Sequence, residues 1–352
     1  MKYREFGKTG LRVPEIGFGC GPSSGLIVYG SREERRTVLA RALDLGVDFF
    51  DTAPMYGNLH SEENLGETLQ DLGAHPTIST KVSVFPEDLD DIPAAVHRSV
   101  EASLKRLGVD TIDIYYLHSM ILDKAPPPGP ASKVVYSSTG EEYLGPGGRG
   151  LTAEQLLGPG GVADAFDQLK AEGKVRCAGV SIYTGDAPAA IHRVIDSGRF
   201  DCAQIYHNIL NPTAAIPRPE GFTGPDRGQT LPKAAAQRMG VAVIRPLELG
   251  ALTGVDERHA QGKVEQGPEY ERNYRRSEAL SFLATEGKQT LAQAALRYCL
   301  STPGVSTIMV GFSNVRQIEE AAEASDRGPL PPEDMERINA LYRSDFGLAA
   351  AR

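Results

Sequence analysis

Residues 47–82 read VDFFDTAPMYGNLHSEENLGETLQDLGAHPTISTKV, and this stretch decides the fold class. It begins with a short apolar run, Val47–Asp51, and ends with a second short run, Thr77–Val82. Between them, Ser61–Leu72 has the spacing of a helix with one apolar face. The stretch therefore predicts a strand, a helix and a second strand, which is the unit from which parallel sheets are built.

The same alternation continues along most of the chain. Several of the strand candidates are apolar or small on both faces, as parallel strands buried on both sides are. The other strand candidates are Ile16–Cys20, Ile112–Leu117, Val175–Ser181, Cys202–Tyr206, Val241–Pro246 and Val305–Val310. The other predicted helices are one that follows a capping box at Ser31–Glu34 and stops at Gly46, then Asp91–Leu107, Val162–Glu172, Ala187–Ser197, Pro232–Met239, Thr290–Leu300 and Val315–Ala324.

Eight strands alternating with helices predict an α/β fold of the (β/α)8 TIM-barrel type, as a single domain over residues 1–352. A doubly wound sheet shows the same alternation, but the count of eight and the absence of a GxGxxG string after an early strand favour the barrel. Arg4–Val13 predicts an N-terminal β-hairpin that plugs one end of the barrel. Long loops follow strands 4, 6 and 7, at Ser119–Gly161, Asn211–Leu231 and Leu252–Arg276, on the face that carries barrel active sites.

Composition excludes several classes of protein. Lys plus Arg number 37 against 46 Asp plus Glu, a net charge of −9, which disfavours nucleic acid and anionic membranes as partners. No apolar run approaches the roughly 18 residues of a membrane span, and the N-terminus has no signal-peptide core. The four cysteines are far apart, without a CxxC pair, so no zinc cluster or disulfide framework is expected. These features predict a cytoplasmic, soluble enzyme without a metal site.

Polar residues stand at the ends of three consecutive predicted strands. Asp51 ends the second strand and Tyr56 follows in its loop, Lys81 ends the third, and His118 ends the fourth. In a barrel these side chains converge over one mouth. Lys81 beside Tyr56 is expected to lower the phenol pKa, Asp51 to hold Lys81, and His118 to donate to a substrate oxygen. Such a set suits protonation of a carbonyl oxygen as it gains charge.

With these residues the sequence resembles the aldo-keto reductase family, because Asp51, Tyr56, Lys81 and His118 fall in the order of its catalytic tetrad. The resemblance covers roughly residues 1–325. The other matching strings are DTAPMYG, STK, YYLH, GVS at Gly179–Ser181, QIYHN at Gln204–Asn208, PLELGALTG at Pro246–Gly254 and VGFSNVRQIEE at Val310–Glu320.

The resemblance implies an NADP(H)-dependent oxidoreductase that transfers hydride between nicotinamide and an aldehyde, ketone, sugar or alcohol, with Tyr56 as general acid. It also implies that a small molecule is the partner and that the cofactor binds without a Rossmann fold. The implied cofactor residues are Ser181 and Gln204 for the carboxamide, Leu247, Gly250 and Leu252 for the pyrophosphate, and Gly311, Ser313, Asn314, Gln317 and Glu320 for the adenosine phosphate. The alternatives are a cofactor-binding regulatory protein of the same fold, like the family's channel-associated members, and a metal-dependent barrel hydrolase, which the lack of clustered ligands disfavours.

Three positions depart from the family pattern. Ile182 replaces an Asn after GVS, so one contact to the carboxamide is missing. Arg245 stands where many members stack an aromatic ring on the nicotinamide. It has two interpretations: stacking on the cofactor or binding phosphate, or forming an ion pair with Glu248 or another carboxylate at the barrel mouth. Arg316 is the one cation near the expected phosphate site, so NADP(H) is favoured while NAD(H) stays open.

The segment 119–161 is an insertion rich in Pro and Gly. Val134–Tyr136 and Glu141–Leu144 flank a turn and could form a small hairpin. Two hypotheses remain for it: a lid over the barrel mouth, with Met120, Ile121, Tyr136 or Tyr143 as a substrate wall, or a disordered insertion without a role. The oligomeric state and the substrate are open. His207 is a further candidate for the site.

Overall fold

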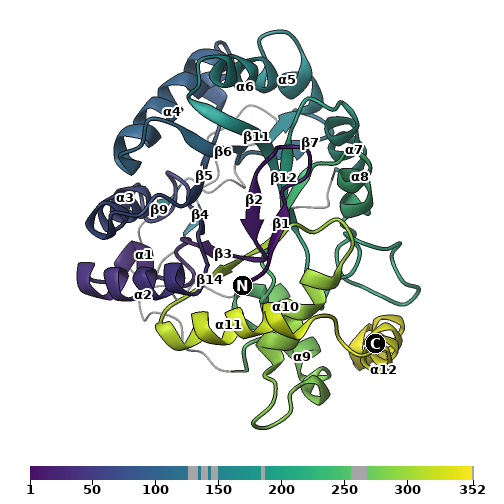
Figure 1. Ribbon diagram of the computed structural model, residues 1–352. Coiled ribbons are helices and arrows are strands. Elements are labelled where there is room, and N and C mark those ends of the chain that lie inside the picture. Colours follow the sequence, from purple (N-terminus) through teal and green to yellow (C-terminus); the bar gives the residue numbers. More distant parts are fainter. Residues whose placement is uncertain (126–133, 136–141, 144–149, 184–186, 255–267, 351–352) are drawn as a thin grey trace.

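The computed structural model describes residues 1–125, 134–135, 142–143, 150–183, 187–254 and 268–350. Eight parallel strands form a closed barrel, in which each strand pairs with the next along the chain and the last pairs with the first. Helices surround this barrel (Figure 1). The strands are β3 (Ile16–Gly19), β4 (Phe49–Asp51), β5 (Thr77–Val82), β6 (Ile112–Leu117), β11 (Val175–Ile182), β12 (Cys202–Tyr206), β13 (Gly240–Ile244) and β14 (Thr307–Gly311). The (β/α)8 prediction is confirmed.

The helices begin where the sequence provides caps. Ser31 accepts from the backbone N–H of Glu34 at 3.2 Å while the Glu34 carboxylate accepts from the N–H of Ser31 at 2.7 Å. Asp91 caps its helix through the N–H of Ala94. The helices are α1 (Leu26–Tyr29), α2 (Arg32–Asp44), α3 (His60–Leu72), α4 (Ile92–Leu107), α5 (Ala153–Leu157), α6 (Val162–Ala171), α7 (Pro188–Asp196), α8 (Thr230–Ala236), α9 (Pro268–Glu278), α10 (Leu291–Ser301), α11 (Val315–Arg327) and α12 (Pro332–Arg343).

The N-terminal hairpin closes one end of the barrel. Strands β1 (Tyr3–Glu5) and β2 (Arg12–Pro14) pair antiparallel, and Gly10 in their turn has a φ of 77°. Phe6, Leu11 and Val13 are buried against the barrel interior. Figure 1 shows the hairpin lying across the barrel end that faces the viewer. The other mouth of the barrel, where the loops that follow the strands gather, is therefore at the opposite end.

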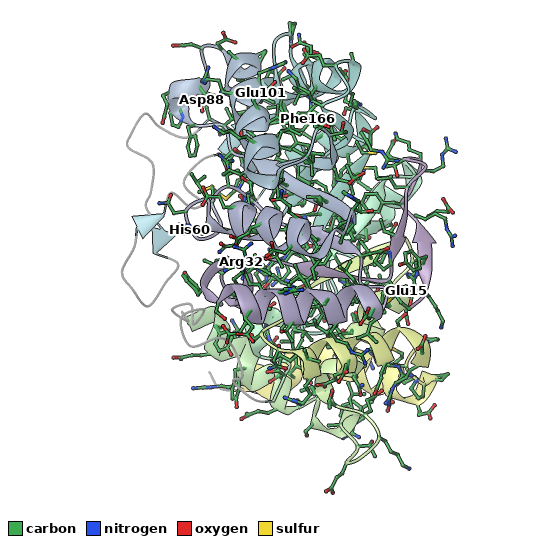
Figure 2. The ribbon with its side chains drawn as sticks, turned by 60° about the vertical axis from the view of Figure 1, so that its left-hand side comes forward. Glu15, Arg32, His60, Asp88, Glu101 and Phe166 are labelled. Carbon is green, nitrogen blue, oxygen red and sulfur yellow. The ribbon has the colours of Figure 1, made fainter. Side chains whose placement is uncertain are left out.

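The insertion after β6 is held at its base by a second, small sheet. Strand β7 (Met120–Leu122) pairs in parallel with β10 (Gly150–Thr152), so the two ends of the insertion lie side by side. Within it, β8 (Val134–Val135) and β9 (Glu142–Tyr143) form the expected hairpin. Figure 2 shows this hairpin near His60, at the end of the barrel away from Glu15 and the N-terminal hairpin. The Pro126–Pro130 run, Tyr136 and the Gly145–Gly148 run lie outside the described residues.

Two of the predicted loops are shorter than expected. The Leu252–Arg276 segment contains most of α9, and α8 begins at Thr230, before the predicted end of the loop after the sixth strand. The chain also ends in a helix the pattern did not predict, α12, whose Tyr342 hydroxyl donates to the carbonyl of Ile209 at 2.9 Å. Within the described ranges, no helix combines the length and apolar character that crossing a bilayer requires.

Candidate active site

Asp51 and Lys81 form a buried ion pair at the carboxyl ends of β4 and β5. The Lys81 ammonium donates to Asp51 Oδ2 at 2.8 Å and to the carbonyl of Thr52 at 2.7 Å. The other Asp51 oxygen accepts from Ser79 and Gln204, each at 2.6 Å. Burial by itself would lower the pKa of Lys81, but the adjacent carboxylate raises it above its ordinary value, so the ammonium stays charged.

Tyr56 lies in the loop between β4 and α3, beside this ion pair. The Lys81 nitrogen is 4.6 Å from the centre of the phenol ring. Burial raises the pKa of Tyr56, and the positive charge of Lys81 opposes this only in part. Lys81 acts in the direction expected from the sequence, but the net pKa of the phenol is raised and not lowered, because loss of water around the phenolate outweighs the nearby cation. At neutral pH Tyr56 is a protonated phenol.

His118 stands against the same phenol from the end of β6. Its ring centre is 5.8 Å from that of Tyr56, with the planes at 84°. The ring of Tyr183 also packs edge-on against the imidazole, with the ring centres 6.2 Å apart, and its hydroxyl donates to the carbonyl of His118 at 2.9 Å. Burial and then the charge of Lys81 hold the pKa of His118 well below 6.5. The imidazole is therefore neutral and has one N–H to donate.

A cavity of about 620 Å³ extends from Tyr56 and His118 to the start of α11. This volume is within the range of ligand sites. Other lining residues come from the segments that follow β3, β4, β6, β11, β13 and β14 and from the N-terminus of α10, at the same barrel mouth. They include Gly21, Pro22, Ser23, Ser24, Met55, Met120, Tyr183, Arg245, Pro246, Leu249, Thr253, Thr290, Phe312 and Arg316.

Ser181 and Gln204 line this cavity and are bonded to the ion pair behind it. Ser181 Oγ donates to Gln204 Oε1 at 3.1 Å, and Gln204 donates to Asp51 as described above. Both side chains are almost fully buried. The Gln204 amide nitrogen is thus hydrogen-bonded to Asp51, a contact that neither the spacing nor the family strings indicate.

A model of the aldo/keto reductase family matches residues 15–343. The chain belongs to the aldo/keto reductase family. Its relatives include L-galactose dehydrogenase of Arabidopsis thaliana, 26% identical over 92% of this chain and 88% of that protein. They also include a probable voltage-gated potassium channel subunit beta of Oryza sativa, 25% identical over 98% of this chain and 97% of that one. A third is L-glyceraldehyde 3-phosphate reductase of Escherichia coli, 27% identical over 96% of this chain and 92% of that enzyme.

Solved structures agree with this fold. An aldo-keto reductase of Bacillus halodurans in its holo form superposes with a TM-score of 0.68 at 23% identity, over 97% of this chain and 96% of that one. An aldo-keto reductase of Klebsiella pneumoniae in complex with NADPH gives a TM-score of 0.64 at 22% identity, over 97% and 95% of the two chains. At these identities the likeness establishes the aldo/keto reductase barrel and no more.

The loop after β13 is tightly folded around the side chain of Glu248. Its carboxylate is buried and accepts from Tyr206 Oη and Asn208 Nδ2, each at 2.5 Å, and from Asn273 Nδ2 at 3.1 Å. Leu247 and Gly250 line the cavity, as the family strings imply. Leu252 does not, because its side chain is buried in the hydrophobic core. The ion pair between Arg245 and Glu248 that the sequence left open does not form, since neutral donors surround that carboxylate.

The far end of the cavity lies at the first turn of α11. Gly311, Ser313, Gln317 and Glu320 line it. Asn314 is outside the lining and caps the helix by accepting from the N–H of Gln317 at 3.1 Å. The positive end of this helix faces the cavity wall, which favours an anion there.

The sequence analysis did not predict some of the residues that line the cavity. Pro22, Ser24, Thr253 and Thr290 reach the cavity from the same mouth, and the rule that post-strand loops gather there was the available signal. His207 does not face the cavity: its ring lies on Tyr298, its Nε2 is 3.0 Å from Thr302 Oγ1, and burial lowers its pKa to about 4. Among the described residues, no group of three or more His, Cys, Asp or Glu is placed to hold a metal ion.

Proposed function

We propose that this aldo/keto reductase is an NADP(H)-dependent oxidoreductase acting on an aldehyde, ketone or sugar and the corresponding alcohol. The observation that carries the proposal is the convergence of Tyr56, Lys81 and His118 at one end of a long cavity. The relatives that are named as a dehydrogenase and a reductase of small sugars or their phosphates support an activity of this class.

The side chains of this site suit the proton-transfer half of the reaction. The protonated Tyr56 donates its proton to the carbonyl oxygen, and Lys81 stabilises the phenolate that is left behind. Neutral His118 has an N–H that can donate to the same oxygen and hold it beside the phenol. Asp51 keeps the ammonium of Lys81 charged and in place.

The cavity also fits the cofactor. Gln204 and Ser181 present amide and hydroxyl groups for a carboxamide, the loop at Leu247–Gly250 and the positive end of α11 line the cavity where phosphates would lie, and Arg316 supplies a positive charge. When bound, NADPH supplies the hydride that reaches the carbonyl carbon. Tighter binding of NADPH than of NADH, with a difference that shrinks as salt is added, would support NADP(H) over NAD(H).

Turnover tests the proposal directly. The purified protein is mixed with NADPH and a panel of aldehydes, ketones and sugars, and the loss of NADPH absorbance is followed. The reverse reaction is followed with alcohols and NADP+. Substrate-dependent oxidation of NADPH that is abolished in Tyr56→Phe supports the proposal. Absence of turnover in both directions with both nicotinamides contradicts it.

A regulatory protein of the same fold is the second candidate, because one relative over nearly the whole chain is named as a probable channel subunit. The two functions differ in one measurable respect. A regulatory protein would bind NADPH yet turn over simple aldehydes no faster than the Tyr56→Phe variant does.

A further inference from the structure

Two arginine side chains approach the ring of Tyr206, and one of them, Arg245, lines the cavity. The guanidinium carbon of Arg227 lies 4.0 Å from the centre of the Tyr206 ring, and that of Arg245 lies 5.6 Å from it. Arg227 is buried, whereas Arg245 is exposed and lines the cavity. Two like charges at one ring repel each other, and a negative group nearby would offset this repulsion.

No carboxylate in the described residues forms an ion pair with either arginine. The nearest candidate by sequence is Glu248, whose oxygens accept from the neutral groups of Tyr206, Asn208 and Asn273. Arg227 donates one Nη1 to the carbonyl of Tyr183 at 3.0 Å, and its buried Nε has no hydrogen-bond partner in the structure. One carboxylate set against two guanidinium groups leaves this corner with a net positive charge.

The backbone of Arg245 is also held in place. Its φ is 55°, a left-handed conformation that residues other than glycine seldom adopt. Its carbonyl accepts from Asn208 Nδ2 at 3.0 Å and from the N–H of Glu248 at 3.1 Å. Strained backbone of this kind gathers at functional sites, where the surrounding contacts support it.

The arginine pair belongs to the catalytic end of the cavity. Tyr183, which binds Arg227, packs against the imidazole of His118. The charge of Arg245 is also one of the influences that lower the pKa of Tyr56. The second cation in the described lining, Arg316, lies on α11 at the other end, 3.7 Å from Glu320.

We propose that Arg245 forms an anion site at the substrate end of the cavity, with Arg227 at the same tyrosine ring adding a second positive charge, and that the preferred substrates are aldehydes or ketones carrying a carboxylate or phosphate. The inference rests on the proposed oxidoreductase function and adds the substrate class. In the reaction, the carbonyl carbon gains the hydride and the oxygen gains the Tyr56 proton. The anionic substituent is unchanged and serves only to hold the substrate against the guanidinium groups.

The test compares benzaldehyde with 4-carboxybenzaldehyde, which share the reacting group and differ in charge. Wild-type kcat/KM is expected to be at least about tenfold higher for the carboxylated aldehyde. Arg245→Gln is expected to lose about 10- to 100-fold on that substrate and a smaller factor on benzaldehyde, which has no anionic group to lose from the site. Arg245→Lys should retain part of the preference, since it keeps the charge and loses the planar fork.

Arg12→Gln is the matched control, because it removes the same charge from the exposed hairpin at the opposite end of the barrel. Arg227→Gln is the second test variant, and the exposed Arg245 keeps the proposal testable if that buried variant does not fold. Glyceraldehyde and glyceraldehyde 3-phosphate repeat the comparison for a phosphate.

The outcomes separate the inference from the proposed function. If benzaldehyde is reduced but the carboxylated aldehyde is no better, or if Arg245→Gln affects both equally, the anion site is wrong and the oxidoreductase function stands. If Arg245→Gln instead weakens NADPH binding in a fluorescence titration, the arginine serves the cofactor and the inference is overturned. If neither aldehyde is reduced, calorimetry of benzoate with the protein–NADP+ complex decides: binding lost in Arg245→Gln supports the site, and equal or absent binding refutes it.

Discussion

Tyr56 is presented by a turn in which the next three residues, Gly57, Asn58 and Leu59, have φ values of 60°, 50° and 80°. For residues other than glycine this conformation costs about 1–2 kcal/mol each. A Cβ on Gly57 would lie 2.1 Å from Cγ1 of Val28 in α1. The position of the phenol therefore depends on close packing of the turn against α1 as well as on the strand that precedes it.

Tyr56→Phe tests the general acid while keeping the ring. Reduction is expected to fall by at least about 100-fold, the lower end of what a positioned general acid contributes. NADPH affinity, measured by fluorescence titration, should stay close to wild type. Retention of most activity would remove Tyr56 from the mechanism.

Lys81→Met tests how the ammonium acts on the phenol. Burial raises the pKa of Tyr56 and Lys81 opposes that rise, so removing the charge should raise the pKa further. Alcohol oxidation needs the phenolate, which forms only as pH rises through this pKa. The rising limb of its pH profile should therefore move to higher pH. An unchanged profile would mean that Lys81 serves only to support the structure around Asp51.

Among the elements, the loop after β13 shows how a buried side chain fixes a strained backbone. Arg245, Glu248 and Leu249 all have positive φ, and the Glu248 carboxylate accepts hydrogen bonds from β12, from the residue Asn208 that follows it, and from α9. A carboxylate satisfied in this way is costly to disturb, since its loss leaves several buried donors unpaired. The loop that lines the cavity is thus held from behind.

The insertion between β7 and β10 can be replaced by a short linker without moving the two strands. Because these strands are adjacent and parallel, a linker has to return only about 10 Å along the strand and about 5 Å across, which six Gly and Ser residues in place of residues 124–149 can span. Met120 at the base lines the cavity. If the insertion is a lid, the KM and the substrate ranking should change while NADPH affinity stays near wild type.

The thermal unfolding midpoint of the shortened protein serves as the control for folding. Identical kinetics and an identical substrate ranking in a stably folded variant would show that the insertion has no role over the mouth. The hairpin of β8 and β9 would then be an addition without effect on catalysis.

At the scale of the molecule, a buried ion pair ties the C-terminal segment to the loops at the barrel mouth. Arg276 Nη2 in α9 donates to Asp345 Oδ1 at 2.6 Å, and both side chains are almost completely buried. Burial would raise the pKa of Asp345, but hydrogen bonds from Thr223 and the charge of Arg276 outweigh it and lower the pKa. Arg276 also donates to Asn273, which donates to Glu248. Hydrogen bonds therefore connect Asp345 to the loop that lines the cavity.

Arg276→Met is expected to reduce the free energy of unfolding by about 1.5–3 kcal/mol, because the Asp345 carboxylate loses its buried charged partner and keeps only the more exposed Arg272, 3.1 Å from its other oxygen. Denaturant unfolding measures this. Arg193→Met is the matched control, since the Arg193–Glu154 pair is exposed and should contribute at most about 1 kcal/mol. In wild type, the contribution of Asp345 should be lost only as pH falls through its lowered pKa. Equal stability of the two variants would show that the buried pair contributes little.

The fold and the meeting of Asp51, Tyr56, Lys81 and His118 at one mouth were predictable from sequence because both depend on local pattern. The observed ends of the barrel strands differ from the predicted ones by at most two residues, since short apolar runs between capped helices have few alternatives in a closed parallel sheet. Asp51, Lys81 and His118 were found for the same reason: polar residues at the carboxyl ends of such strands meet at one mouth.

Helix α9 shows where this reasoning stops. Its buried residues are Asn273, Arg276 and Ser277, which periodicity counts as exposed, so the sequence predicted a loop there. These side chains are buried because their partners, Glu248 and Asp345, come from distant parts of the chain.

The direction of the Tyr56 pKa shift and the groups that surround Arg245 likewise depend on contacts between distant parts of the chain. Loss of water and the choice of charged partners depend on every element packed around a group. Residue order alone determined the strands, most of the helices and which polar residues meet at the barrel mouth, whereas only the tertiary structure decided which charges are paired and which remain available at the cavity rim.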